Sequence, residues 1–507
     1  MFCNIKSACL LGIDGFIVDV EIDLSKGIPV FNIVGLPDAS IRESKERIKS
    51  AILNSGYDFP NCRIVINLSP ADIKKEGPYF DLAMAVGILN RNYDFNEEYI
   101  KDSLFLGELS LDGKLKKIRG VLPIIIEAKN RKFKRVFLPL ENIKEASYID
   151  GIELYGIKNL IELIGFLTNK RKLNIYVKEK IDLKDEYKLD FSDIKGNYFV
   201  KRAVEIAAAG NHNLLMIGPP GSGKTMIAKR INTILPDMTE EEIIEVSKIY
   251  SATGLIDENI GIITKRPFRS PHHTITKTAL IGGGNDARPG EVVLAHRGVL
   301  FLDELLEFDR KILETLRQPI EDKYVNISRV KINLKYPCNV LLIASMNPCP
   351  CGYFGDATKE CKCSTSEVKR YLNKISGPLL DRFDLYVEVT SLNYDEFQKN
   401  EDVENSSQVK KRIEKARKIQ MDRYKNENIF TNNEINSKDI DKHCCLNKES
   451  KNFIKSVFTK YKFSSRSYYK LLKTARTIAD LEGEEKINVN HISEALSFRK
   501  AYFNYWG

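Results

Sequence analysis

A glycine-rich segment in the middle of the chain has the residue types and spacing of a phosphate-binding loop. It follows an apolar run at 214–217 and precedes a helix-like run that begins at Met226. Glycines let backbone N–H groups curl around phosphate oxygens, the lysine brings positive charge to the terminal phosphates, and the threonine hydroxyl is a ligand for Mg²⁺. The alternative is a strand-to-helix turn without a ligand. The predicted nucleotide-binding residues are Gly218, Pro219, Pro220, Gly221, Ser222, Gly223, Lys224 and Thr225.

Two acidic residues follow the apolar run at 299–302 and complete this site. We expect Asp303 to hold Mg²⁺ together with Thr225, and Glu304 to polarise the water that attacks the γ-phosphate. Acidic residues that merely complement a helix dipole are the alternative. The pair therefore predicts ATP hydrolysis with Mg²⁺ as cofactor.

Longer motifs extend this assignment. The chain resembles, over nearly its full length, the AAA+ ATPases of the magnesium-chelatase clade, and within it the YifB/ComM-type proteins. The motifs that carry the resemblance are SPHHTIT (270–276), IGGGNDARPGEVVLAHRGVLFLDE (281–304), SMNPCPCGY (345–353), GPLLDRFD (377–384) and SSRSYYKLLKTARTIADL (464–481).

The resemblance implies three further catalytic residues. Asn347 is similar to sensor 1, Arg382 to the arginine finger that reaches a neighbouring subunit's nucleotide, and Arg466 to sensor 2 on a helical lid. An arginine supplied in trans requires a homo-oligomeric ring, which the resemblance implies is a hexamer. The alternatives are a turn residue for Asn347, a salt bridge with Asp381 or Asp384 for Arg382, and a surface cation for Arg466.

Four cysteines lie within fifteen residues. Cys349, Cys351, Cys361 and Cys363 have the spacing C-x-C-x₉-C-x-C. Four thiolates on a short polar loop can close a tetrahedral Zn²⁺ site, which would fold a segment too polar to fold alone. This spacing departs from the commoner C-x-x-C knuckle, so structural zinc, free structural or redox thiols, and a catalytic metal all remain open.

A hairpin and two histidines flank these motifs. Residues 325–336 alternate apolar with polar, which predicts a β-hairpin. In the resembling clade a hairpin at this place projects into the ring channel. The resemblance then implies that Arg329 and Lys331 contact a polymer in the channel. The alternative is a plain hairpin in which both side chains are solvated. His272 and His273 have no third ligand at metal-binding spacing, and we expect loop or intersubunit hydrogen bonds from them.

The N-terminal region is similar to the proteolytic domain of Lon-type proteases, on KEGP (75–78), LGELSLDG (106–113) and FLP (137–139). In that family a serine follows the Gly-Pro and a lysine follows a glycine turn. Here Tyr79 and Leu122 take their places, which predicts a Lon-like fold without peptidase activity. The first predicted helix carries four cationic side chains. They could contact a phosphate backbone, and the alternative is a solvated helix face. These residues are Arg42, Lys45, Arg47 and Lys49.

Strand and helix patterns alternate between these motifs and predict an α/β protein. Alternation at 16–24 predicts a half-buried strand, and Ser40 with Glu43 has the spacing of a capping box at a helix start. Buried-looking strands between helices at 214–344 predict a parallel sheet. The predicted domains are a Lon-like domain (1–168), a charged linker (169–195), an AAA+ core with a P-loop and parallel sheet (196–391) and a helical lid (392–507).

Composition places the chain among globular proteins. Of its 507 residues, 43% are hydrophobic and 29% charged, and no window has the roughly 18 continuous apolar residues of a membrane span. We expect a cytoplasmic protein with no secretory signal and no membrane partner. The net charge of +9 is concentrated after residue 400, which favours either a solvated helical face or a surface for a polyanion.

The resemblance implies an ATP-dependent ring motor that acts on DNA, namely a ComM-like helicase that drives branch migration in recombination of incoming DNA during natural transformation. The first alternative is a chelatase-like or protein-remodelling motor acting on a protein partner. An ATP-dependent protease is disfavoured by Tyr79, and a scaffold without turnover is disfavoured by the intact ATPase residues.

Overall fold

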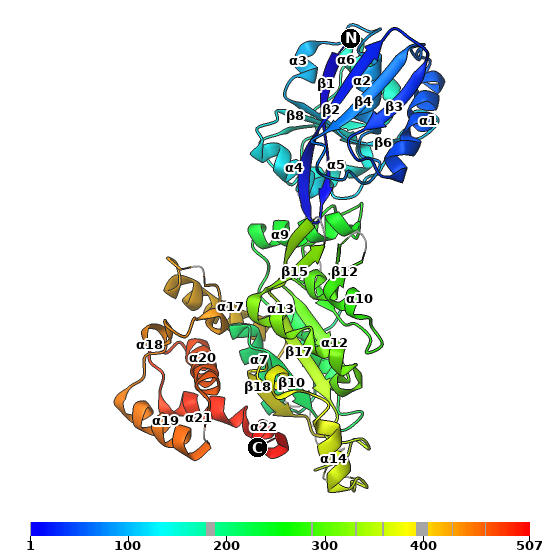
Figure 1. Cartoon of the computed structure of the whole chain (residues 1–507). Helices are drawn as coiled ribbons and strands as arrows, with labels where there is room; N and C mark the ends of the chain where they lie inside the picture. Colours follow the sequence, from blue (N-terminus) through cyan, green and yellow to red (C-terminus); the bar gives the residue numbers. More distant parts are fainter. Residues whose placement is uncertain are drawn as a thin grey trace. The chain divides into compact units, whose positions relative to one another are not determined.

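The computed structural model describes residues 2–178, 188–284, 287–329, 332–356, 359–391, 404–427, 429–461 and 463–506. Internal contacts divide the chain into two units (Figure 1). The first comprises Met1–Leu183 and Thr239–Thr264, and the second comprises Lys184–Met238 and Lys265–Gly507. Part of the predicted linker, residues 179–187, lies outside the described residues.

A seven-stranded mixed sheet with the order β3-β4-β2-β1-β5-β8-β9 forms the centre of the first unit (Figure 1). The pairs β1–β2 and β2–β4 are antiparallel, and the other neighbours are parallel. The half-buried strand predicted at 16–24 is confirmed, since Val18, Val20 and Ile22 are fully buried. The strands are β1 (Phe2–Leu11), β2 (Asp14–Ser25), β3 (Val30–Val34), β4 (Arg63–Ser69), β5 (Ser103–Phe105), β8 (Arg135–Pro139) and β9 (Glu153–Ile157), with the small pair β6 (Glu108–Leu109) and β7 (Leu115–Lys116).

The helices of this unit differ from the sequence prediction at one cap. Helix α1 begins after Asp38, whose carboxylate accepts a hydrogen bond from Ile41 N at 2.8 Å, so the predicted capping box at Ser40 is wrong. Aspartate caps as well as serine and stands earlier in the chain. The helices are α1 (Ala39–Asn54), α2 (Asp81–Leu89), α3 (Glu97–Ile100), α4 (Val121–Asn130), α5 (Ile143–Ala146), α6 (Leu160–Leu167) and α9 (Glu240–Thr253).

One of the four cations on α1 serves the core instead of a solvated or phosphate-binding face. The Arg47 Nε atom donates to Asp81 Oδ2 at 3.0 Å, and the Asp81 side chain is fully buried. Ser44 adds a hydrogen bond from its hydroxyl to Asp81 at 2.6 Å. A buried carboxylate requires such partners. Arg42 and Lys49 remain exposed.

The second unit contains the predicted parallel sheet. Its five strands have the order β11-β14-β17-β10-β18, and every pairing is parallel. All residues of β10, β14 and β17 are buried, as expected for a sheet covered on both faces. The strands are β10 (Leu214–Ile217), β11 (Phe268–Arg269), β14 (Val299–Leu302), β17 (Leu341–Met346) and β18 (Leu385–Glu388).

Two hairpin-like pairs and a set of helices accompany this sheet. The predicted hairpin is confirmed as β15 (Tyr324–Arg329) and β16 (Ile332–Pro337), which pair antiparallel, and β12 (Gly282–Gly283) pairs with β13 (Arg288–Pro289). Lys331 and the side chain of Arg329 lie outside the described part. The helices are α7 (Tyr198–Gly210), α8 (Lys224–Arg230), α10 (Lys277–Ile281), α11 (Glu291–Leu294), α12 (Arg310–Glu314), α13 (Arg317–Asp322), α14 (Thr365–Leu372) and α15 (Gly377–Leu380).

The C-terminal region is helical, as predicted, and shares a core with the sheet (Figure 1). The Arg412 guanidinium on α17 pairs with Glu205 on α7 at 2.6 Å, and Thr477 on α20 hydrogen bonds to His212 at 2.7 Å. These contacts join the lid to α7 and to the turn that connects α7 to the P-loop strand β10. The lid helices are α17 (Ser406–Arg423), α18 (Ile440–His443), α19 (Lys448–Tyr461), α20 (Ser465–Glu482), α21 (Val489–Ser497) and α22 (Lys500–Trp506).

Candidate nucleotide-binding and hydrolysis site

The predicted phosphate-binding loop connects β10 to α8. Gly221 and Gly223 have φ values of +79° and +88°, which glycine adopts without steric cost, so the loop can curl tightly before the helix. The Lys224 ammonium is buried and donates to Gly218 O at 2.7 Å and Pro219 O at 2.8 Å. Burial lowers the pKa of Lys224 to about 8, and the charges of Asp303 and Glu304 oppose that shift.

The predicted acidic pair lies beside this loop. Thr225 Oγ1 donates to Asp303 Oδ2 at 2.7 Å, and the Ser345 hydroxyl donates to the other oxygen of Asp303. A hydroxyl at the start of α8 and a carboxylate at the end of β14, in contact with each other, provide the oxygen donors that Mg²⁺ prefers. The residues present therefore fit the ion, and Thr225 and Asp303 would be its protein ligands. Bound Mg²⁺ would neutralise charge on the nucleotide phosphates.

Glu304 occupies a position suited to a water-activating base. Its side chain is 60% exposed, and its backbone adopts a left-handed conformation with φ of +50°. The Glu304 N–H donates to Ser345 Oγ at 3.3 Å, which ties the residue to β17. A strained non-glycine backbone persists where surrounding contacts enforce it, and such positions cluster at functional sites. The carboxylate is thus held at the sheet edge while remaining accessible to water.

His273 is a neighbour of Glu304 that sequence reasoning missed. Its Nδ1 atom lies 3.9 Å from Glu304 Oε2, and its ring packs against that of His272 with centroids 4.1 Å apart. The two histidines were expected to make loop or intersubunit hydrogen bonds, and His272 does contact the Thr274 hydroxyl at 2.9 Å. The proximity of His273 to Glu304 could have been predicted only from the strand order of the sheet. His273 follows β11 and Glu304 follows β14, and these two strands are neighbours.

Asn347 joins the phosphate loop. It follows β17, the strand between β14 and β10, and its Oδ1 atom lies 3.3 Å from Lys224 Nζ. Gly218 N also donates to Met346 O at 3.2 Å, so the end of β17 is bonded directly to the loop. An amide in this position can contact both the terminal phosphate and the attacking water.

The two predicted arginines form a separate group. Arg382 forms an ion pair with Glu321, and Arg466 pairs with the same carboxylate at 2.7 Å. Asp381 and Asp384 were the alternative partners predicted for Arg382. Among the described residues, neither forms an ion pair with it. Burial lowers the pKa of Arg382, and the charge of Arg466 lowers it further. Arg382 and Arg466 are thus brought together through Glu321, and no hydrogen bond or ion pair of the described chain links them to the P-loop.

The four predicted cysteines converge. Cys349 Sγ lies 3.3 Å from Cys351 Sγ and 3.7 Å from Cys361 Sγ, and all four sulfurs lie within 4.8 Å of one another. None of them is in a disulfide. The arrangement has the ligand number and size of a site for one metal ion.

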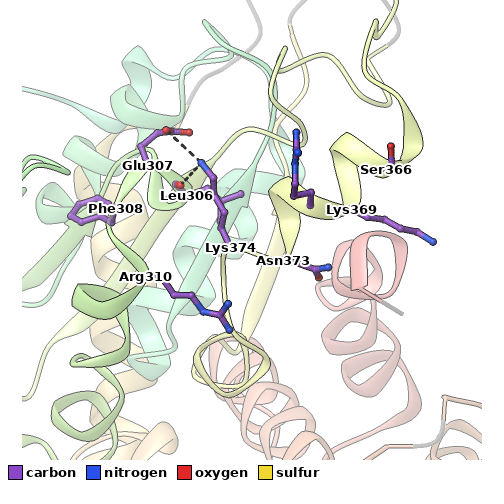
Figure 2. Close-up of a pocket in the computed structure, with 9 residues that line it drawn as sticks. Leu306, Glu307, Phe308, Arg310, Ser366, Lys369, Asn373 and Lys374 are labelled. Carbon is purple, nitrogen blue, oxygen red and sulfur yellow. Dashed lines mark hydrogen bonds and ion pairs between the residues drawn. The ribbon is translucent and has the colours of Figure 1, made fainter.

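A basic cleft of about 780 Å³ lies between the segment after Glu304 and helix α14. Figure 2 shows Arg310, Lys369 and Lys374 around it, with Lys374 bonded to Leu306 O at 3.1 Å and to Glu307 at 3.8 Å. Arg370 also lines the cleft, so the lining contains four cations and one carboxylate. Sequence reasoning missed this surface, because its residues come from two separated segments.

The positions of the protease dyad are buried in the first unit. Tyr79 is 8% exposed and Leu122 is fully buried. The Leu122 N–H donates to the buried Glu145 carboxylate at 3.1 Å, and Ser251 of the segment Thr239–Thr264 donates its hydroxyl to the same group. This segment precedes β11 in sequence yet packs with the first unit, where Gly120 N donates to Ser251 O at 3.0 Å.

None of the helices in the described ranges is long and apolar enough to cross a membrane.

Comparisons with known proteins agree with this architecture. The families described as "Magnesium chelatase, subunit ChlI", "Subunit ChlI of Mg-chelatase" and "Magnesium chelatase, subunit ChlI C-terminal" match residues 190–397, 20–142 and 403–499. Competence protein ComM of Haemophilus influenzae is 40% identical over 98% of this chain and 97% of its own length. The YifB protein of Escherichia coli is 38% identical over 98% and 96%. Lon protease 2 of Bacillus subtilis is 32% identical over 27% of this chain and 26% of its own length. The chain therefore belongs to the ComM/YifB family of magnesium-chelatase ChlI-like AAA ATPases, with partial similarity to Lon protease in its N-terminal region.

Proposed function

We propose that this protein is an ATP-driven ring motor that acts on DNA and drives branch migration when incoming DNA recombines in the cytoplasm. The observation that carries the proposal is the convergence of Lys224, Thr225, Asp303 and Asn347 at the phosphate-binding loop, combined with 40% identity to Competence protein ComM across nearly the whole chain. Similarity of that extent covers all three predicted domains, including the N-terminal one.

The hydrolysis step follows from the residues of the site. Lys224 and the loop bind the phosphates, Thr225 and Asp303 would hold the Mg²⁺ that neutralises phosphate charge, and Glu304 takes a proton from the attacking water. Asn347 positions that water relative to the γ-phosphate. Arg382 completes the site of a neighbouring subunit, which is why the proposal includes a homo-oligomeric ring, with six subunits by analogy with ComM-type proteins.

A polyanionic partner is supported by the basic cleft. Lys369 and Arg370 are exposed on α14, and the exposed Arg310 at the start of α12 lines the same cleft. Lysine and arginine side chains contribute to DNA binding by displacing counterions from phosphates, so each contact makes the affinity dependent on salt. The cleft thus gives DNA a surface on the same unit that hydrolyses ATP.

A chelatase-like motor acting on a protein partner is the second candidate. It is favoured by the three matching families, all of which are described by a magnesium-chelatase subunit. The two candidates differ in what accelerates ATP turnover.

The deciding measurement is steady-state ATP hydrolysis with single-stranded, duplex and four-way DNA at low and moderate salt. We expect the strongest stimulation with branched DNA, a steep loss of stimulation as salt rises, and no response in Glu304→Gln. Hydrolysis indifferent to every DNA would contradict the DNA motor and favour the protein-remodelling candidate.

The cleft gives a separate prediction. The double variant Lys369→Ala with Arg370→Ala should weaken DNA binding at all sequences and lower the slope of log affinity against log salt by about two, because two phosphate contacts are lost. Fluorescence anisotropy with a labelled four-way junction measures both quantities. The charge-matched control is Lys425→Ala with Lys438→Ala, two exposed lysines of the lid. An equal loss in the control would mean that net charge, and not this cleft, binds DNA.

A further inference from the structure

The cysteine cluster has the geometry of a site for a single metal ion. A zinc ion with Zn–S bonds of about 2.3 Å holds its four sulfurs about 3.8 Å apart in a regular tetrahedron. Cys349 and Cys361 are 3.7 Å apart at Sγ, and Cys351 and Cys361 are 3.6 Å apart. An iron–sulfur cluster arranges its cysteines around several metal atoms and needs a wider cage. The four sulfurs therefore fit one tetrahedral ion, and all-thiolate donors of this geometry select zinc in most proteins.

Backbone groups around the cluster support bound thiolates. Phe354 N donates to Cys349 Sγ at 3.3 Å, and Gly352 N donates to Cys349 O at 3.0 Å. Hydrogen bonds of this kind orient metal ligands from outside the coordination sphere. The described residues between β17 and α14 form no helix or strand, so no regular backbone ladder holds this loop.

The cluster is attached to the nucleotide site at two points. Cys349 lies two residues after Asn347, whose Oδ1 atom is 3.3 Å from Lys224 Nζ. On its other side, Gly352 lies against Pro220 of the P-loop: a Cβ atom at Gly352 would be 2.5 Å from Pro220 Cδ, so only glycine permits this approach. The φ of +87° at Gly352 imposes the same requirement.

We propose that Cys349, Cys351, Cys361 and Cys363 bind one structural zinc ion, and that this zinc centre holds Asn347 and the P-loop in the arrangement that binds ATP. The coupling of the zinc centre to ATP binding rests on the proposed nucleotide site alone and does not depend on DNA binding. Without the ion, the segment after Asn347 loses the cross-link that closes it, so fewer molecules present Asn347 and Pro220 in the binding arrangement. Apparent ATP affinity falls by the same factor as that population.

The test uses the full-length chain purified without chelator. Metal content is measured by mass spectrometry. Nucleotide affinity is measured with a fluorescent ATP analogue in the absence of DNA. We expect about one zinc per chain, and in Cys361→Ser loss of the zinc. In the same variant we expect about tenfold weaker nucleotide binding. Cys361 is chosen because its backbone is distant in sequence from the P-loop contact at Gly352. Cys445→Ser, which removes an exposed thiol of the lid, should match the unchanged protein in both measurements.

A second measurement covers the case in which Cys361→Ser fails to fold. Wild-type protein is stripped with a mercurial reagent and a chelator, and zinc is then returned after the thiols are freed. Nucleotide affinity should fall and recover with the metal. Protein that holds no zinc even after reconstitution, or holds iron instead, would overturn the metal site. Zinc-free protein that binds ATP as tightly as the loaded form would overturn the coupling. Neither result depends on whether DNA stimulates hydrolysis, so failure here is distinct from failure of the DNA motor.

Discussion

Glu304→Gln should lower steady-state ATP hydrolysis by about 10²- to 10⁴-fold, the usual contribution of a general base. The amide has nearly the shape of the carboxylate but cannot take the proton of the attacking water. Nucleotide binding should be retained, because Glu304 is exposed at the edge of the sheet and its N–H contacts Ser345, whereas the phosphates are bound by the loop and Lys224. Phosphate release and titration with a fluorescent nucleotide measure the two effects separately.

Two comparisons make this result specific. Lys224→Ala should lose nucleotide binding as well as turnover, since it removes the buried ammonium of the loop. Glu449→Gln removes the same charge from an exposed position on α19 and should leave both measurements unchanged. If Glu304→Gln and Lys224→Ala lost nucleotide affinity equally, Glu304 would be a binding residue and the base would have to be another group.

The parts of the site that sequence predicts are those built from adjacent residues. A P-loop binds phosphate with the backbone of eight consecutive positions, so its pattern is visible in the sequence. Asp303 and Glu304 are likewise visible, because a buried strand ends directly before them. The cysteine cluster was predicted as a group for the same reason, since its four residues lie on one loop.

Contacts between distant segments could not be predicted in this way. Glu321 binds Arg382 and Arg466 across 61 and 145 residues, and a single carboxylate on a short helix leaves no periodic signal. The contact of His273 with Glu304 and the docking of Ser251 on Glu145 depend on which strands and helices become neighbours. The wrong cap predicted for the first helix has a similar cause. Asp38 and Ser40 are both good N-cap residues and lie two positions apart, and the backbone of the folded chain places Asp38 at the cap.

Arg382→Ala should lower hydrolysis by about 10³- to 10⁵-fold, the effect of removing an arginine finger, while nucleotide binding persists. Within one chain Arg382 is bound to Glu321 and makes no contact with Lys224 or Asp303 among the described residues. We therefore expect Arg382 to act on nucleotide that is bound to a neighbouring subunit. Arg382→Lys should restore little, because an ammonium lacks the planar fork of the guanidinium.

Mixing two inactive variants separates action in trans from action in cis. Chains with Arg382→Ala keep Lys224 and bind nucleotide, whereas chains with Lys224→Ala keep Arg382. In a ring with head-to-tail interfaces, about a quarter of the sites in an equimolar mixture combine an intact loop with an intact arginine from the neighbour. Hydrolysis should therefore reappear on mixing and rise with the time allowed for subunit exchange. Continued inactivity of mixed rings that native mass spectrometry shows to have formed would place Arg382 in its own subunit's site, and the pairing with Glu321 would then be a resting state within a single chain.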